Sequence, residues 1–588
     1  MLGRFKETVA EARAHVTACA RTDGTSTQAL GTSMLAGSVH LVVIHHGLWG
    51  SPANTEYLAT TLAKYHGGLI SPHCTLTPPE CASTISALAS THPNSTNHIR
   101  MVVLNSEVNS GDHTYDGIDW CAERLIKDVY REVERIEQDE NAKVAKLSLI
   151  GYSLGGLVIR YAAGVMYSDG LFAESKCNTG KKLMFTSRPV AASMSTIATP
   201  HLGVTLTGSM FSKVAAAVGR SNLGRTGKQL YLADRGWKAD SHLSTQETPK
   251  HAHAQSDEDE GLCLIEALSD PRFNFITAMR LFSRIDVYAN AVADLTVSYR
   301  TAAFEAHDPF VLADQIHLVR DPDHPPLVVS FSITKPCNKT TPFWSTLAAK
   351  LSPNNLPWML NPQRFPIRFP LNYVALLCLP VVLPVMVGLV LHKLRSDSRV
   401  SNRRVEEFER LWAVENAGLS GKDPVIQDDS LNRKNGKKEK SVSTLVKLDA
   451  ATRGELERKR VANLLATVEA EVEETFREVG EDYVRTSAPM ASPAPSDSRY
   501  ITKTNDATTF APRSSYASLP EQQPLLPTQH RILSNLNNAS LLPQVKKHLA
   551  HFPDVLNSHA VIIVRTPTMD AHKKGMQLIK AFVQRFEL

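Results

Sequence analysis

The stretch that decides the fold is Lys146-Leu-Ser-Leu-Ile-Gly-Tyr-Ser-Leu-Gly-Gly-Leu-Val-Ile-Arg160, where a short apolar run leads into a serine flanked by glycines. Residues 147–150 predict a buried strand, and the residues from Leu157 onward predict a helix. The G-x-S-x-G pattern of a nucleophile elbow lies between them, with Gly151 and Gly155 on either side of Ser153. The glycines are needed because the chain crosses close to itself at so sharp a turn. We therefore predict that Ser153 is a nucleophile; an idle serine on a glycine-rich turn is the alternative.

The segments around the elbow predict an α/β fold. Continuous apolar runs are typical of parallel strands that helices cover on both faces. A helix is expected at residues 55–66, and a long amphipathic helix at residues 120–138. Strands and helices that alternate in this order predict an α/β-hydrolase with a mostly parallel sheet. The expected strands are residues 39–44, 99–104, 191–198 and 284–290.

The loop His45-His-Gly-Leu-Trp-Gly50 follows the first expected strand. In open α/β sheets, ligands bind at the carboxyl ends of the strands. In hydrolases of this class such a loop supplies one of the two N–H groups that bind the oxyanion. We predict that Leu48 donates this N–H and that Leu154, directly after Ser153, donates the other. His45 and His46 are expected to shape the turn rather than to act as the base.

The acid and the base are sought after the later strands, because the chain order in this fold is serine, acid, histidine. Asp294 lies just past the expected strand 284–290 and is the predicted acid. His559 is the predicted base, on a loop before the strand-like residues 561–564. A Ser-Asp-His triad needs neither a metal ion nor an organic cofactor. The other candidates for the base are His307, His317, His324 and His551.

Residues 371–391 form a run of 21 residues without a charge. As a helix this run would extend about 30 Å, enough to cross the apolar core of a bilayer. Pro380 and Pro384 would kink such a span or turn it into a hairpin within one leaflet. We predict a membrane-associated segment; a buried core helix is the alternative.

The predicted organisation interrupts the hydrolase domain with a long insertion. Residues 1–37 are an N-terminal lead-in, and residues 38–345 are the first part of the domain, with a lid at about residues 204–262. Residues 346–400 carry the membrane-associated segment. Residues 401–530 are expected to form a charged, helical and then disordered linker, rich in Pro, Ser and Thr toward its end. The last part, residues 531–588, is expected to return to the domain.

Composition excludes several classes of protein. The net charge of +5 on 588 residues gives no reason to expect nucleic-acid binding. Eight cysteines without a C-x-x-C pair indicate neither a zinc site nor a disulfide framework. The first residues contain no apolar core of a signal peptide. We therefore expect a catalytic domain that faces the cytosol.

Seven motifs occur in the order typical of one family. They are HLVVIHHGLWG, TYDGIDWCAERL, LIGYSLGGLVIRY, IATPHLGV, LGRTGKQL, ANAVADLTVSYRTA and SHAVIIVR, within residues 39–304 and 555–588. With these motifs the chain resembles the fungal serine esterases and lipases related to lipid-droplet phospholipases and Rog-type monoacylglycerol lipases. The resemblance matches His559 to the late histidine of the family. Tyr152 stands where that family usually has histidine.

The resemblance implies a hydrolase for acyl esters of lipids, such as glycerolipids or phospholipids, at a membrane or lipid-droplet surface. The lipid droplet and the endoplasmic reticulum are the expected locations. Two alternatives stay open from the sequence. An acyltransferase would use the same acyl-enzyme with an alcohol as acceptor, and a non-catalytic membrane tether would keep the elbow without using it.

Overall fold

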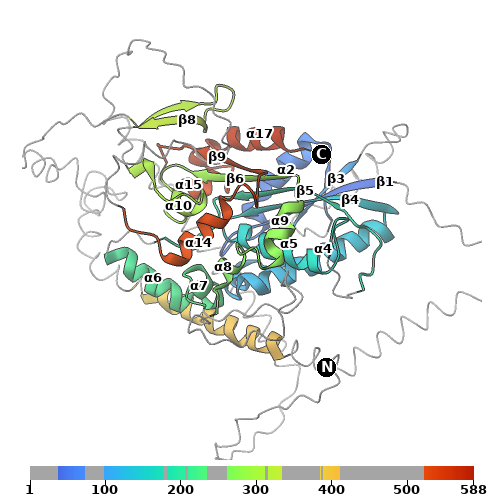
Figure 1. Ribbon diagram of the computed structural model, residues 1–588, viewed down its shortest axis with the longest axis horizontal. Helices are drawn as coiled ribbons and strands as arrows, with labels where there is room; N and C mark the ends of the chain where they lie inside the picture. The colour runs from blue at the N-terminus through green and yellow to red at the C-terminus, as the bar shows by residue number, and fades with distance from the viewer. Residues whose placement is uncertain are drawn as a thin grey trace, which may run out of the picture. The chain divides into compact units, whose positions relative to one another are not determined.

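A nine-stranded sheet carries the elbow at its centre (Figure 1). The strand order is β2-β3-β1-β4-β5-β6-β9-β8-β7, parallel from β2 to β9 and antiparallel from β9 through β8 to β7. This confirms the expected mostly parallel sheet. The computed structural model describes residues 37–72, 99–176, 182–205, 210–234, 261–311, 316–333, 385, 388–410, 522–555 and 557–587. The strands are β1 Gly37–His45, β2 Leu69–Ile70, β3 Arg100–Asn105, β4 Ala142–Tyr152, β5 Val190–Ile197, β6 Arg284–Asn290, β7 Ile316–Arg320, β8 Leu327–Ile333 and β9 Val545–Ala550.

Helices cover both faces of the sheet, as the apolar runs predict (Figure 1). On β1, Leu41 and Val43 pack toward α4 Ile118–Gln138, α5 Leu154–Ser168 and α9 Asn274–Leu281. Val42 and Ile44 pack toward α2 Glu56–Tyr65 and α17 Met576–Arg585 on the other face. Successive side chains of a strand point to opposite faces, so each residue of the run is buried. The other labelled helices are η1 Pro52–Asn54, η2 Gly111–Tyr115, α6 Met210–Asn222, α7 Gly224–Leu230, α8 Leu264–Ala267, α10 Tyr299–Ala302, α14 Pro527–Leu536, α15 Ser558–Val561 and α16 Asp570–Lys573.

The last part of the chain, residues 531–588, is called the C-terminal block below. It completes the sheet through β9, which lies between β6 and β8. Its register with β6 runs from Ile285 opposite Val545 to Asn290 opposite Ala550. The expectation of a strand at residues 561–564 is wrong, because these residues end α15 and form the turn after it. A four-residue apolar run does not distinguish a strand from a buried helix by its periodicity. The closing helix, by contrast, is present as α17.

The predicted membrane segment at 371–391 lies outside the described residues, apart from 385 and 388–391. Within the described part of the chain, no helix has the length and apolarity to cross a bilayer. Residues 388–410 form one helix, which crosses the predicted boundary between residues 400 and 401. Ser401 and Val405 on this helix are buried, and Phe408 packs against Trp120 of α4 with ring centroids 5.5 Å apart. The part of this helix that the structure describes therefore packs on the hydrolase domain on both sides of the predicted boundary.

Part of the predicted lid is fixed in the domain. Residues 206–209 and 235–260 of that region are not described, but α7 is. The side chains of Thr226 and Gln229 on α7 are buried and accept hydrogen bonds from the main-chain N–H groups of Gly117 (2.9 Å) and Ile118 (2.6 Å). The first N–H groups of a helix have no partner within the helix, so these acceptors cap α4. Residues 224–230 are thus structural.

Candidate active site

The elbow holds Ser153 in a strained backbone conformation between β4 and α5. Its φ of 54° and ψ of −124° are rare for a residue with a side chain. Such a conformation costs about 1–3 kcal/mol and persists only where the surrounding packing enforces it. A Cβ on Gly151 would collide with the main chain of Gly155, and a Cβ on Gly155 would collide with the carbonyl oxygens of His45 and His46. The predicted glycines therefore allow the close crossing that lifts Ser153 above the sheet.

The structure brings together the three residues that were predicted as nucleophile, acid and base. The Ser153 hydroxyl lies 3.0 Å from His559 Nε2, and His559 Nδ1 lies 3.0 Å from Asp294 Oδ2. Ser153 and His559 are 7% and 3% exposed, so the hydrogen bonds are shielded from water. Because the carboxylate only accepts, Nδ1 carries the proton and Nε2 is free to accept from the serine.

Each of the three residues lies past the carboxyl end of a parallel strand. Ser153 follows β4, Asp294 follows β6, and His559 lies beyond β9 on α15. These ends meet at one edge of the sheet. The site therefore depends on the return of the C-terminal block to the sheet.

Asp294 is held as a carboxylate by its surroundings. Its Oδ1 accepts from the main-chain N–H groups of Thr296 (3.0 Å) and Val297 (2.8 Å), and its Oδ2 also accepts from the Asn290 side chain (2.8 Å). Burial by itself would raise the pKa of Asp294, but the attraction of His559 and these hydrogen bonds hold the pKa below its ordinary value. Asn290, the last residue of β6, was not identified from the sequence.

His559 is fixed by its main chain as well as its ring. The Asn557 side chain accepts from the His559 N–H at 3.2 Å, and the Tyr152 hydroxyl donates to the His559 carbonyl at 2.8 Å. The rings of Tyr152 and His559 also lie 5.0 Å apart, centroid to centroid. Tyr152 therefore links the elbow directly to the histidine. The sequence offered one signal for this, the departure from the usual histidine of the family at this position.

The other candidate histidines lie elsewhere. His307 and His317 are exposed, the latter on β7 near the far edge of the sheet. His551 contacts Arg320 at 3.0 Å, and His324 lies in the turn between β7 and β8.

The loop after β1 passes directly against the serine. A Cβ on Gly47 would come within 2.7 Å of Ser153 Cβ, so glycine is needed there. Leu48 follows Gly47, and Leu154 is the first residue of α5, where helix N–H groups have no partner within the helix. His45 and His46 are fully buried. Burial lowers the pKa of His46 to about 4 and that of His45 well below its ordinary value, so both are neutral, as expected for residues that shape the turn.

We predict that Tyr152→Phe lowers kcat about 3- to 10-fold and leaves KM unchanged, because it removes one hydrogen bond that fixes His559 but keeps the ring contact. Steady-state kinetics on a water-soluble ester measures this. Tyr130→Phe is the matched control, since Tyr130 also donates a hydrogen bond, to Asp169 at 2.8 Å, but lies on α4. Both variants should lose about 1 kcal/mol of stability. Equal kcat values for the two variants would show that Tyr152 acts on stability alone.

Comparisons with known proteins find similarity over part of this chain. Residues 36–307, fewer than half of the chain, match the family described as "Putative serine esterase (DUF676)". The chain is 26% identical over 248 residues to "Putative lipase ROG1" of Saccharomyces cerevisiae, covering 42% of this chain and 28% of that protein. It thus spans less than a third of the length of this relative. His559 lies outside the family match.

Two solved structures are similar over less than half of this chain. Phospholipase PlaB from Legionella pneumophila is 16% identical, with 45% of this chain and 43% of that chain covered and a TM-score of 0.21. An extracellular alpha/beta-hydrolase from a Paenibacillus species is 15% identical, with 31% of this chain and 51% of that chain covered and a TM-score of 0.16. Scores this low support no argument about activity. The elbow and the sheet fit this family match, which relates residues 36–307 to serine esterases.

Proposed function

We propose that this protein is a lipid ester hydrolase that uses Ser153, His559 and Asp294 as its catalytic triad. His559 Nε2 takes the proton of Ser153 as the serine oxygen attacks the ester carbonyl. The N–H groups of Leu48 and Leu154 stabilise the negative oxygen of the tetrahedral intermediate. His559 then gives the proton to the leaving alcohol. A water molecule, deprotonated by the same histidine, hydrolyses the acyl-enzyme and releases the fatty acid.

The observation that carries this proposal is the continuous chain of hydrogen bonds from Ser153 through His559 to Asp294, at 3.0 Å for each step. These residues are far apart in sequence, and only the sheet brings them together. A serine without a catalytic role has no need of the strained conformation at the elbow.

A lipid substrate is supported by the apolar side chains next to the site. Trp49, on the loop that passes Ser153, is 56% exposed, and Leu295, next to Asp294, is 79% exposed. Large exposed apolar side chains are typical of surfaces that contact lipid or protein. We place the site at a membrane or lipid-droplet surface, with the catalytic domain on the cytosolic side.

The test is a panel of glycerolipids and phospholipids, supplied with and without an alcohol acceptor, with products identified by mass spectrometry. Release of free fatty acid by the wild type and not by Ser153→Ala supports hydrolysis. Transfer of the acyl group to the alcohol as the main product would show an acyltransferase. No turnover of any ester, together with no labelling by a fluorophosphonate, would contradict the proposal.

We predict that a variant lacking residues 371–387 no longer pellets with lipid vesicles but keeps its activity on water-soluble esters. The deletion removes most of the apolar run and spares the helix 388–410, which packs on the domain. Vesicle sedimentation at high salt and hydrolysis of a short-chain ester measure the two properties. If the variant still pellets with vesicles, the anchor lies elsewhere in the chain.

A further inference from the structure

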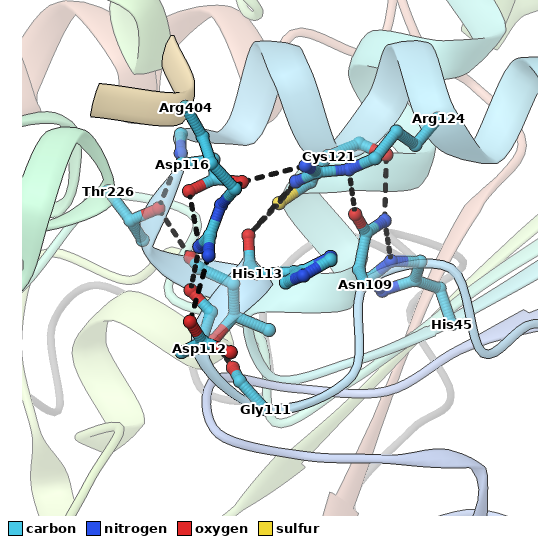
Figure 2. A network of polar contacts seen from close by, with 12 residues as sticks. His45, Asn109, Gly111, Asp112, His113, Asp116, Cys121, Arg124, Thr226 and Arg404 are labelled. Atoms are coloured by element: carbon cyan, nitrogen blue, oxygen red, sulfur yellow. Dashed lines mark hydrogen bonds and ion pairs between the residues drawn. The ribbon is translucent and has the colours of Figure 1, made fainter. Parts of the chain in front are cut away.

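Arg404, on the helix 388–410, holds both ends of η2 (Figure 2). Its guanidinium donates to the side chain (2.9 Å) and to the carbonyl (3.0 Å) of Asp112, near the start of η2. It also donates to both oxygens of Asp116, directly after η2, at 2.9 and 3.2 Å. The Asp116 side chain is fully buried and that of Arg404 is 21% exposed. Only a planar fork of donors makes four such contacts at once.

The helix η2 in turn holds the loop that passes Ser153. The Gly111 N–H donates to the Gly50 carbonyl at 2.8 Å, and the Trp49 N–H donates to the Thr114 hydroxyl at 3.1 Å. The Trp49 indole N–H donates to the Tyr115 hydroxyl at 2.7 Å. Trp49 has a positive φ of 58°, a conformation that these hydrogen bonds maintain.

A second path runs from Asp116 to the other end of the loop (Figure 2). Arg124 donates to Asp116 Oδ2 at 2.7 Å and to Asn109 Oδ1 at 2.7 Å. The Asn109 amide donates to His45 Nε2 at 2.8 Å, which leaves the proton on Nδ1, and Nδ1 donates to the His46 carbonyl at 2.8 Å. The buried, neutral His45 therefore fixes the peptide that precedes Gly47.

Leu48 lies between these two anchors, with Gly47 packed against Ser153 on one side and Trp49 and Gly50 bound to η2 on the other. We propose that Arg404 is a positioning residue for the reaction: it fixes η2, and through η2 it places the Leu48 N–H over the reacting carbonyl. This inference rests on the proposed function. Arg404 lies outside the stretch that matches the esterase family, because that match ends at residue 307.

The expected effect is on the chemical step. Loss of one oxyanion donor costs about 100- to 1,000-fold in kcat, so a displaced donor should cost about 10- to 100-fold. We expect Arg404→Gln to lower kcat by this factor, with KM within about 2-fold, on a water-soluble ester and with active sites titrated. Arg404→Lys keeps the positive charge but not the planar set of donors, so its kcat should lie between those of Arg404→Gln and the wild type. Arg403→Gln is the matched control, because Arg403 is the exposed neighbour on the same helix.

A readout that does not depend on activity is hydrogen–deuterium exchange. Arg404→Gln should speed exchange of the amides of residues 47–50 and 111–117, and Arg403→Gln should not. The inference is wrong if these amides exchange at the same rate in Arg404→Gln as in Arg403→Gln. It is also wrong if the two variants have the same kcat. A lower melting temperature with unchanged kcat per active site would likewise overturn it, because the contact would then only stabilise the fold.

A double-mutant cycle tests the path. Thr114→Val removes the acceptor of the Trp49 N–H without changing the side-chain shape, and it should lower kcat by itself. If Arg404 acts through η2, the fold-decrease in kcat of the double variant Arg404→Gln/Thr114→Val should be smaller than the product of the fold-decreases of the two single variants. Independent, multiplicative effects would contradict the path through η2. Failure of the proposed function is seen separately: the wild type would then not be labelled at Ser153, while the exchange measurement would still decide whether Arg404 orders the loop.

Discussion

Ser153→Ala should reduce ester hydrolysis by at least about 10⁴-fold and leave the fold intact. Removal of a triad member leaves only the catalysis that oxyanion donors and substrate binding provide. Alanine keeps the Cβ that already fits at φ 54°, so the elbow has no reason to rearrange. The measurements are hydrolysis of a short-chain ester, labelling by a fluorophosphonate probe and the melting temperature. Residual activity above about a hundredth of wild type would rule out Ser153 as the nucleophile.

His559→Ala should lose activity about as fully as Ser153→Ala, and the double variant should be no worse, because triad members act as a unit. The reason is the hydrogen bond of 3.0 Å between the Ser153 hydroxyl and His559 Nε2. His317→Ala is the control and should keep most of its activity, since His317 is exposed on β7.

The opposite result for this pair would change the reading of the site. An active His559→Ala variant with an inactive His317→Ala variant would place the base before residue 371 and make the C-terminal block purely structural. The melting temperature of each variant is measured first, because a variant that unfolds at the assay temperature would lose activity without any change in its catalytic residues.

The sequence predicts the elbow and the central strands well, because their signals are local. The run at residues 39–44 is buried on both faces and is apolar apart from His40, and Gly151 is required by contacts within one turn. Asp294 is predicted by a different signal, the order of serine, acid and histidine along the chain. Its contact with His559 was predicted from chain order and from the resemblance, and the structure places both residues accordingly.

Features that depend on distant partners were missed. The strand β9 has the sequence VKKHLA, with three polar residues in its middle, because Lys547 pairs with Glu305 at 2.5 Å and His548 with Asp286 at 2.7 Å. Such partners cannot be read from the strand itself. The helix 388–410 packs through Ser398, Ser401 and Val405, and serines give no apolar stripe to recognise.

The position of β9 in the sheet affects how this protein folds while the ribosome is still synthesising it. The neighbours of β9 are β6 and β8, and β8 ends at Ile333, whereas β9 begins at Val545. At about 5–20 residues per second, the intervening chain takes on the order of 10–40 s to synthesise. During that time β6 and β8 present unpaired edges, which in other proteins invite aggregation. The nascent chain would also hold Ser153 and Asp294 without His559, so the proposed triad would be incomplete until His559 has been synthesised.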